Sequence, residues 1–378
     1  MPKPVTARIA EGVTSIPAAQ WDACAGDANP FVSHAFLAAL ERSGSATAET
    51  GWQPLPIVID GPDGTPAAIA PAYGKSHSQG EYVFDHAWAD AWERAGGRYY
   101  PKLQVAAPFT PVPGPRLLLR DAALAPALIA GLEAVADQNR LSSVHATFLE
   151  DAQLPLFEEA GWLARAGTQF HWHNDGYASF DDFLSALSSR KRKAIRKERE
   201  RARDGLIFRH LTGAEITEAH WDAFWIFYQD TGSRKWGQPY LTRPFFSMLG
   251  ETMGDKLILM LAERDGRPIA GALNLIGGDA LYGRYWGCSE EVPFLHFELC
   301  YYQAIDAAIE RGLPRVEAGA QGEHKLARGY VPVTTWSAHY IPDPGFRRAI
   351  AEYLEREKQA VAHEQEYLGE LTPFKRGG

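Results

Sequence analysis

Two stretches of this chain repeat one pattern, and the repeat constrains the fold more than any single motif does. DGTPAAIAPAY at 63–73 returns as DGRPIAGALNL at 265–275. In both, Asp-Gly supplies a tight turn before a run of small and apolar residues, which predicts a β-hairpin leading into a central strand. FLAALERS at 36–43 is echoed by FLSALSSR at 183–190, with apolar residues at helical spacing. Repetition of this kind indicates that the two halves form the same kind of unit.

A third echo lies near the end of each half. FEEAGWL places Trp162 after Gly161, and KLARGYV places Tyr330 after Gly329. Glycine suits the position directly after a helix, so both strings predict a helix, a glycine and then a strand that begins with an aromatic residue. The length of 378 residues also fits two domains that each bury a core.

The expected organisation is therefore an N-terminal domain over 1–175 and a C-terminal domain over 176–378. Periodicity predicts these elements in the first half: helices 33–43, 86–95, 122–139 and 154–160, with strands 55–60, 67–73, 80–85, 99–107, 143–149 and 162–173. It predicts these in the second half: helices 180–203, 215–230, 243–253, 295–311 and 323–328, strands 206–211, 257–276 (a hairpin), 280–287, 314–319 and 332–341, and a C-terminal helix over 345–368. This order indicates an α/β fold with mixed (α+β) sheets.

Composition narrows the function classes. The chain has 38 Lys and Arg against 47 Asp and Glu, a formal net charge of −9, so no DNA partner is expected. Its three cysteines are far apart and form no C-x-x-C pair, which argues against a disulfide framework and a structural zinc site. No stretch is apolar over the roughly 18 residues of a membrane span. We expect a metal-free cytoplasmic protein that contacts the inner membrane only peripherally.

The run RKRKAIRKERERAR at 190–203 departs from this acidic average. It holds nine Lys or Arg and two Glu, with charges all round a helix. A solvated linker helix over 180–203 accounts for it, and so does contact with an anionic membrane surface, with CoA phosphates or with a tRNA backbone. The run is compatible with each of these partners and does not choose among them.

The order of elements, twice over, resembles tandem domains of the Gcn5-related N-acetyltransferase (GNAT) type, as in the Fem-type aminoacyltransferases. Two long strings resemble more closely a family of N-acyltransferases known as FemAB-like or peptidoglycan biosynthesis/recognition proteins. These strings are KSHSQGEYVFDHAWADAWERAGGRYYPKLQVAAPFTPVPGPRLL at 75–118 and VEAGAQGEHKLARGYVPV at 316–333. That family in turn resembles bacterial ceramide synthases.

The resemblance implies transfer of an acyl group from acyl-CoA, as co-substrate, to an amine acceptor such as a sphingoid base or another lipid amine. No permanently bound cofactor is implied. Two alternatives stay open: aminoacyl transfer from tRNA to a peptidoglycan precursor, and a catalytically silent ligand-recognition protein.

The chain departs from the acetyl-CoA-using members of the fold in its phosphate loop. Those members carry a glycine-rich loop whose N–H groups hold the pyrophosphate. Here the first equivalent loop, PFTPVPGPRLLLRD, offers Gly114 and Arg116 as candidate phosphate contacts. The second, GCSEEVPF, places Glu290 and Glu291 where phosphates would lie, so an anion would be repelled there.

The best candidate for the chemistry is GAQGEHKLARGY at 319–330. Acyl transfer needs a proton acceptor for the amine and donors for the developing oxyanion. Glu323 or His324 would accept the proton, while Lys325 would hold a carbonyl or phosphate and Arg328 would bind substrate. Lys325 also resembles a lysine in a similar late position of Fem-type enzymes. A capped, solvated helix start is the structural alternative.

A second candidate is KSHSQGEYVFD at 75–85, which we expect to form a strand. Alternation would place His77, Gln79, Glu81 and Asp85 on one face and Ser78, Tyr82 and Phe84 on the other. On a central strand such a polar ladder would line a cleft. The expected site residues are catalytic His77 and the acceptor-binding Ser76, Ser78, Gln79, Glu81, Tyr82 and Asp85.

The third candidate is YGRYWGC at 282–288. Alternation on a strand would turn Tyr282, Arg284 and Trp286 the same way. Arg284 and Trp286 would then bind an acyl chain or headgroup, although core packing explains the aromatic residues equally well. His171 and His173 have the spacing of two metal ligands on one strand, but no third ligand is indicated.

Overall fold

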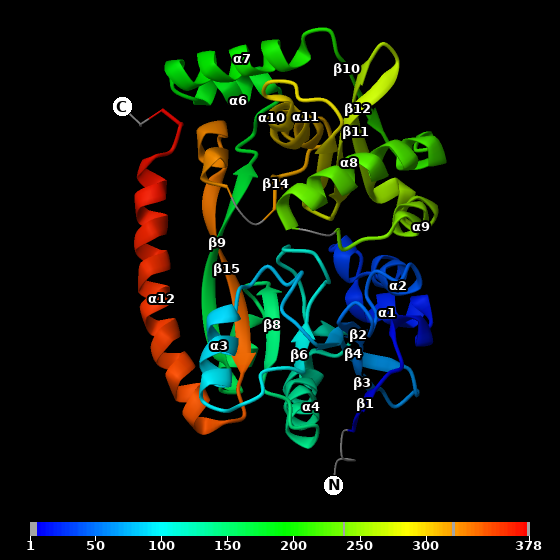
Figure 1. The fold of residues 1–378 in the computed structure, drawn as a ribbon, viewed down its shortest axis with the longest axis vertical. Helices are drawn as coiled ribbons and strands as arrows, with labels where there is room; N and C mark the ends of the chain where they lie inside the picture. The colour runs from blue at the N-terminus through cyan, green and yellow to red at the C-terminus, as the bar shows by residue number, and fades with distance from the viewer. Residues whose placement is uncertain (1–5, 237–238, 320–321, 376–378) are drawn as a thin grey trace. The chain divides into compact units, whose positions relative to one another are not determined.

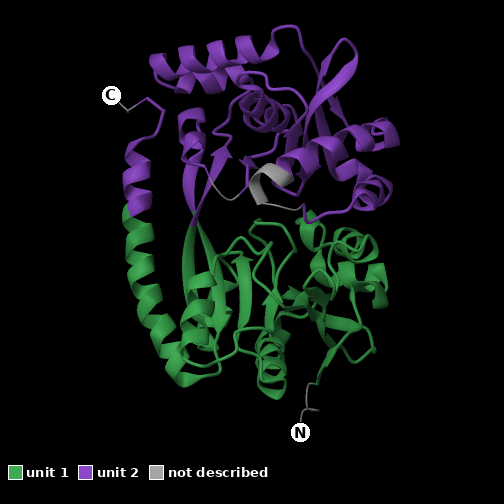
Figure 2. Cartoon of the chain, viewed as in Figure 1, with its two compact units in different colours: residues 1–167, 334–363 green, residues 168–333, 364–378 purple. Residues whose placement is uncertain are grey.

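The chain forms two compact units, each built from two stretches of sequence (Figure 2). The computed structural model describes residues 6–236, 239–319 and 322–375, and only the backbone of 233–236. Unit 1 contains residues 1–167 and 334–363, and unit 2 contains residues 168–333 and 364–378.

Unit 1 begins with a small sheet and continues into a larger one (Figure 1). Its strands are β1 (Ala7–Ile9), β2 (Trp52–Pro54), β3 (Ile57–Asp60), β4 (Pro66–Ala70), β5 (Ala72–Lys75), β6 (Lys102–Val105), β7 (Leu118–Leu119) and β8 (Val144–Leu149). Its helices are α1 (Ala18–Ala25), α2 (His34–Arg42), α3 (His86–Arg94), α4 (Ala125–Gln138) and α5 (Leu154–Glu159). The strand β9 (Leu163–His173) leads out of unit 1 and ends in unit 2.

Unit 2 contains the strands β10 (Ile207–Leu211), β11 (Leu257–Arg264), β12 (Arg267–Ile276), β13 (Ala280–Cys288) and β14 (Arg315–Glu317). Its helices are α6 (Phe180–Ala186), α7 (Ser189–Arg203), α8 (Glu218–Trp236), α9 (Arg243–Met253), α10 (Leu295–Phe297) and α11 (Gln303–Glu310). A π-helical turn, Glu298–Tyr302, joins α10 to α11, and Glu323–Arg328 is a 3₁₀-helix. β15 (Val331–Tyr340) and the long α12 (Pro344–Glu370) each have residues in both units.

The two units follow one topological plan. In unit 2, β10, β11, β12 and β13 are antiparallel neighbours, and β14 then lies parallel to β13. In unit 1, β1, β3 and β4 form the antiparallel part of a small sheet, and β5 pairs with β6, which is parallel to β8. A helical crossover connects each parallel pair, as parallel strands require. The expected mixed α/β fold with tandem GNAT-like units and a C-terminal helix is confirmed.

Each unit takes its last strand from the other half of the sequence. β14 pairs with the end of β9, where Glu317 faces His171. β8 pairs with the end of β15, where His145 faces His339. The units therefore differ from the predicted division near residue 175, because a sequence repeat reveals similar segments but not the strand with which each segment pairs.

The connection between β5 and β6 distinguishes the copies. Unit 2 joins the corresponding strands β12 and β13 through residues 277–279, whereas unit 1 inserts residues 76–101 there. The predicted strand 80–85 lies in this insertion and is wrong. Gly80 and Tyr82 have φ values of 80° and 59°, far from those of a regular strand, and residues 80–85 form turns and bends.

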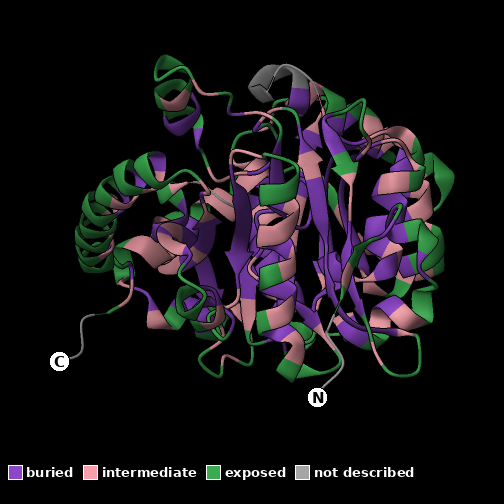
Figure 3. Ribbon diagram, turned by 90° about the horizontal axis from the view of Figure 1, so that it is seen from below, coloured by how far each residue is buried: buried purple, intermediate pink, exposed green. Residues whose placement is uncertain are grey.

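The predicted helix 180–203 is two helices, α6 and α7. Leu187 is extended between them, with ψ of 156°, and its backbone bridges to Phe374. Nearly every residue of β11 and β12 is buried, so both faces of these strands are covered. Across the molecule the strands are mostly buried, whereas many helices carry exposed residues on one side (Figure 3). Burial of this apolar surface is the main force that stabilises each unit.

Candidate functional site

The strands β13 and β14 separate soon after they begin. They pair only from Ala280 to Tyr282 on β13, which continues to Cys288, while β14 ends at Glu317. Beyond Tyr282 no residue of β14 pairs with β13 in the part of the chain that the structure describes. Ligand sites of α/β sheets commonly form at the carboxyl ends of strands where the order of strands changes.

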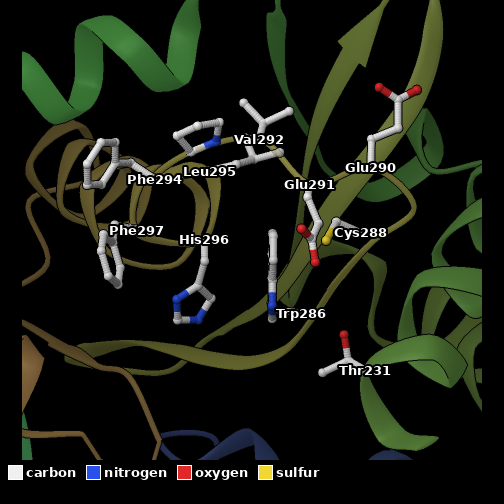
Figure 4. A pocket seen from close by; sticks show the side chains of 11 residues that line it. Thr231, Trp286, Cys288, Glu290, Glu291, Val292, Phe294, Leu295, His296 and Phe297 are labelled. Atoms are coloured by element: carbon white, nitrogen blue, oxygen red, sulfur yellow. The ribbon is translucent and has the colours of Figure 1, made fainter. Parts of the chain in front are cut away.

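A pocket of about 620 Å³ lies at the open end of β13 (Figure 4). The residues that line it are Thr231, Trp286, Cys288, Glu290, Glu291, Val292, Pro293, Phe294, Leu295, His296 and Phe297. The Trp286 and His296 rings lie 5.1 Å apart between centroids. The pocket thus combines aromatic walls with a few polar groups, which is the usual character of a small-molecule site.

A β-bulge changes the predicted faces of β13. Asn274 pairs with Gly283 but Leu273 pairs with Tyr285, so Arg284 is the extra residue. One extra residue reverses the alternation beyond it, because side chains alternate with a period of two. Tyr282 and Trp286 consequently lie on opposite faces, and the prediction that they line one wall is wrong.

The helix after the pocket is irregular. Its first turns contain the π-helical Glu298–Tyr302, and π turns are frequent at functional sites. Phe294, directly before α10, has a φ of 66°. Tyr301, on the π turn, places its hydroxyl 2.8 Å from His324 Nε2, and the Phe297 and His324 rings lie 5.6 Å apart. The pocket wall and the predicted catalytic segment are therefore in contact.

Lys325 is buried in this region, with 1% of its surface exposed. Its ammonium donates a hydrogen bond to the Gly319 carbonyl oxygen at 2.9 Å. Burial lowers the pKa of Lys325 to about 7, and the nearby charge of Arg284 acts in the same direction, whereas Cys300 opposes it. A buried lysine whose pKa is perturbed this far is a candidate for a functional site.

The neighbours of Lys325 in the segment 319–330 have different roles. Arg328 is bound to Glu198 of α7 at 3.0 and 3.1 Å, and its guanidinium lies 3.4 Å from the centre of the Phe297 ring. It therefore fixes the 3₁₀ turn against α7. Glu323 is exposed on the first turn. Residues 320–321 of the predicted segment lie outside the described residues.

The insertion in unit 1 carries a second polar cluster. Lys102 donates to Ser78 Oγ at 2.8 Å and to Glu81 Oε2 at 2.7 Å, and it also forms an ion pair with Asp85. Burial raises the pKa of Glu81 to about 7, whereas the Lys102 charge holds the pKa of Asp85 below its usual range against the opposing effect of burial. Ser78, Glu81 and Asp85 thus meet, but in a closed ion cluster.

The other predicted residues of 75–85 do not join this cluster. His77 Nε2 lies 3.0 Å from the Thr50 carbonyl oxygen, and His77 Nδ1 accepts the Gln79 backbone N–H at 3.1 Å. Ser76 and Gln79 are exposed, and Tyr82 is half-buried with left-handed backbone. The alternating ladder is wrong because the segment is a loop.

Gly114 and Arg116 are committed to the protein itself. Arg116 is buried and donates to the carbonyl oxygens of Val112, Pro115 and Thr147 at 2.8, 3.0 and 2.7 Å. The Gly114 N–H donates to the Phe148 carbonyl oxygen at 3.0 Å. The geometry therefore does not support the expected phosphate contacts, because these donors already hold the loop.

Two buried pairs of side chains are not among the predicted site residues. In unit 2, Glu317 is 3% exposed and lies 3.8 Å from His171, and burial raises its pKa to about 7. In unit 1, His145 and His339 approach to 2.6 Å between Nδ1 atoms. Both pairs occupy the same place in the repeated topology, opposite each other on the last two strands. The repeats SVHA and RVEA at 143–146 and 315–318 were the available signal.

The fold resembles solved structures with little sequence identity. FemX matches with a TM-score of 0.56 at 13% identity, over 89% of this chain and 98% of FemX. L-PGS from Bacillus licheniformis matches with a TM-score of 0.51 at 13% identity, over 87% and 98% of the two chains. The C-terminal domain of a putative lysylphosphatidylglycerol synthetase from Agrobacterium fabrum matches with a TM-score of 0.52 at 11% identity, over 90% and 95%. At these identities the likeness establishes the fold.

Sequence comparison identifies the family. No curated protein matches the chain. Among the described helices, none has the length and apolar character needed to cross a bilayer. The model of the FemAB-like family, described as peptidoglycan biosynthesis/recognition, matches residues 12–376. The chain is therefore a member of the FemAB-like family.

Proposed function

We propose that this protein is an N-acyltransferase that moves an acyl group from acyl-CoA to an amine acceptor, and that the acceptor is a lipid amine of the sphingoid type. The coarser part of the proposal, an acyl or aminoacyl transferase of peptidoglycan or lipid modification, rests on the FemAB-like family and the FemX-like fold. The finer part rests on unit 2, where Phe297 of an aromatic pocket contacts His324, which directly precedes the buried Lys325.

The observation that carries the proposal is the position of Lys325. Its ammonium is buried and held by the Gly319 carbonyl oxygen, so a hydrogen bond from it to a developing oxyanion would be strong in the low-dielectric surroundings. Removing one such donor typically costs about 10² to 10³ in rate.

The neutral amine attacks the thioester carbonyl carbon, so that a C–N bond forms and the carbonyl oxygen becomes an oxyanion held by Lys325. His324 accepts the proton that the amine nitrogen loses. The C–S bond then breaks, and the departing thiolate takes that proton, leaving an amide and free CoA.

The alternative donor is aminoacyl-tRNA, which the same chemistry serves because an ester replaces the thioester. The FemX and lysylphosphatidylglycerol synthetase folds favour this alternative. Glu290, which the sequence places against CoA phosphates, is ion-paired with Arg264 and Arg267, so its charge does not decide between the two donors. A catalytically silent protein is the remaining reading.

The test is release of free thiol from acyl-CoA in the presence of single amines, over several chain lengths. We expect turnover with a long-chain lipid amine, and a loss of roughly 10² to 10³ in kcat for Lys325→Ala. Lys358→Ala, at an exposed position of α12, is the matched control and should keep full activity. No thiol release with any donor and acceptor would overturn the CoA reading, and RNase-sensitive transfer of an amino acid would establish the tRNA alternative.

A further inference from the structure

One face of α7 is used to dock the helix on unit 2. Ile195 and Ala202 are buried, and Glu198 and Arg199 lie on the same side. Glu198 binds Arg328, while Arg199 binds Glu298 at 3.1 Å and Asp306 at 2.5 Å. These contacts fix which side of the helix faces the protein.

The opposite side of α7 is a stripe of basic residues. Arg190, Lys193, Lys197 and Arg201 recur every three or four positions, so they share one helix face, which also holds Glu200. All four are exposed, and within the described ranges none forms an ion pair. Like charges at this spacing repel each other, so the helix alone does not explain the stripe.

The basic stripe reaches the pocket at Arg201, and an exposed apolar residue follows α7 in sequence. The Arg201 guanidinium lies 5.4 Å from the centre of the Phe294 ring, and Phe294 lines the pocket. Ile207, just after the end of α7, is 63% exposed. Cations beside exposed apolar side chains are the combination with which peripheral proteins bind lipid surfaces.

We propose that the basic stripe of α7 docks unit 2 on an anionic lipid bilayer, with the pocket beside the lipid surface. A bilayer touches one face of a protein, so the formal net charge of −9 does not oppose it as it would oppose a long nucleic acid. The proposal goes beyond the transfer reaction and holds whichever donor is used.

The experiment is co-sedimentation of the full chain with vesicles of phosphatidylcholine alone or of an equal mixture with phosphatidylglycerol. We expect binding only to the anionic vesicles, with release at high salt. Replacing all four stripe residues by Gln should weaken binding roughly a thousandfold, at about 1 kcal/mol per cation, because Glu200 is unchanged in the variant. Because the four side chains are exposed, the variant should keep the wild-type melting temperature.

The control variant replaces Arg42, Arg94, Arg98 and Lys358 by Gln, which removes the same charge from exposed positions elsewhere. It should bind anionic vesicles like the wild type. Equal binding to both kinds of vesicle, or equal loss in the control, would overturn the proposal. So would retention of bulk tRNA by the stripe without retention of vesicles. None of these measurements depends on turnover, so a failure of membrane binding and a failure of the proposed transfer reaction can be told apart.

Discussion

Lys102 shows how a single buried charge organises the first unit. It is fully buried, and two carboxylates of the insertion, Glu81 and Asp85, neutralise it. Its own pKa is raised because these carboxylates outweigh the effect of burial. A cluster of this kind adds little net stability compared with apolar packing, but it is costly to break in part.

Lys102→Met is therefore expected to destabilise the protein by about 3–5 kcal/mol, because it leaves two carboxylates buried without their shared cation. Urea unfolding measures the loss. Lys358→Met, on the exposed side of α12, should stay within about 0.5 kcal/mol of wild type. A wild-type midpoint for Lys102→Met would show that the ion cluster does not hold the insertion.

Burial of Lys325 makes the folding stability depend on pH, with a sign opposite to that expected for a lysine in an ordinary ion pair. Its pKa falls from 10.5 to about 7 on folding, so the folded state binds this proton less tightly than the unfolded state. Folding stability contributed by this group therefore decreases as pH falls from 10.5 towards 7 and is constant below that. Lys325→Met removes the effect.

We expect Lys325→Met to gain stability over wild type by roughly 1–4 kcal/mol at about pH 6, and to gain less at about pH 9. Parallel urea titrations at the two pH values give the comparison. If the difference in unfolding free energy between Lys325→Met and wild type were the same at both pH values, the pKa of Lys325 would not be lowered on folding. Lys325→Arg should keep its charge at high pH and extend transfer activity there.

At the scale of elements, the insertion between β5 and β6 depends on backbone that only some residues tolerate. Gly80 has a φ of +80°, and a Cβ there would lie 2.6 Å from Phe109. Gly96, in the same insertion, has a φ of +86° but nothing within 4 Å of a Cβ.

Substitutions at Gly80 and Gly96 distinguish the cost of left-handed backbone from the cost of a steric clash. Gly96→Ala should cost about 1 kcal/mol for the left-handed backbone alone, whereas Gly80→Ala should cost roughly 1–3 kcal/mol more because Phe109 must move. Thermal melts of the two variants test this. Equal melting temperatures would mean that the loop yields at Phe109 without cost.

Elements with local signals could be predicted from sequence. The β11–β12 hairpin has Asp265-Gly266 at its turn, and α9 ends where its apolar period stops. The bulge at Arg284 could not be predicted, because it depends on pairing with Asn274 of the neighbouring strand. Lys325 is a candidate from its neighbours in sequence, whereas the Lys102 cluster depends on how the insertion folds back on β6, and the Glu317–His171 pair depends on the pairing of β14 with β9.

At the scale of the whole molecule, the units are topological copies that each need both halves of the chain. In unit 1, β8 pairs with β6 on one edge, and its other edge has no partner until β15 is present, which follows most of unit 2 in sequence. Cutting at the boundary near residue 175 would therefore leave β8 as an exposed edge.

A fragment of residues 1–175 is expected to lack the cooperative unfolding of the full chain. Circular dichroism during urea unfolding distinguishes the two, and adding a peptide that covers β15 and α12 should restore part of the transition. Cooperative unfolding of the fragment alone would show that the exchanged strand is dispensable.

The exchange of last strands also has a consequence for folding during translation, because β8 is synthesised long before its partner β15. At about 5–20 residues per second, the interval between the emergence of β8 and that of β15 is on the order of ten seconds or more. During that interval the nascent first unit carries an unpaired, apolar strand edge. The order of strands thus means that complete folding of the first half waits for translation of the last segment, and exposed strand edges of this kind are where a nascent chain is prone to aggregate.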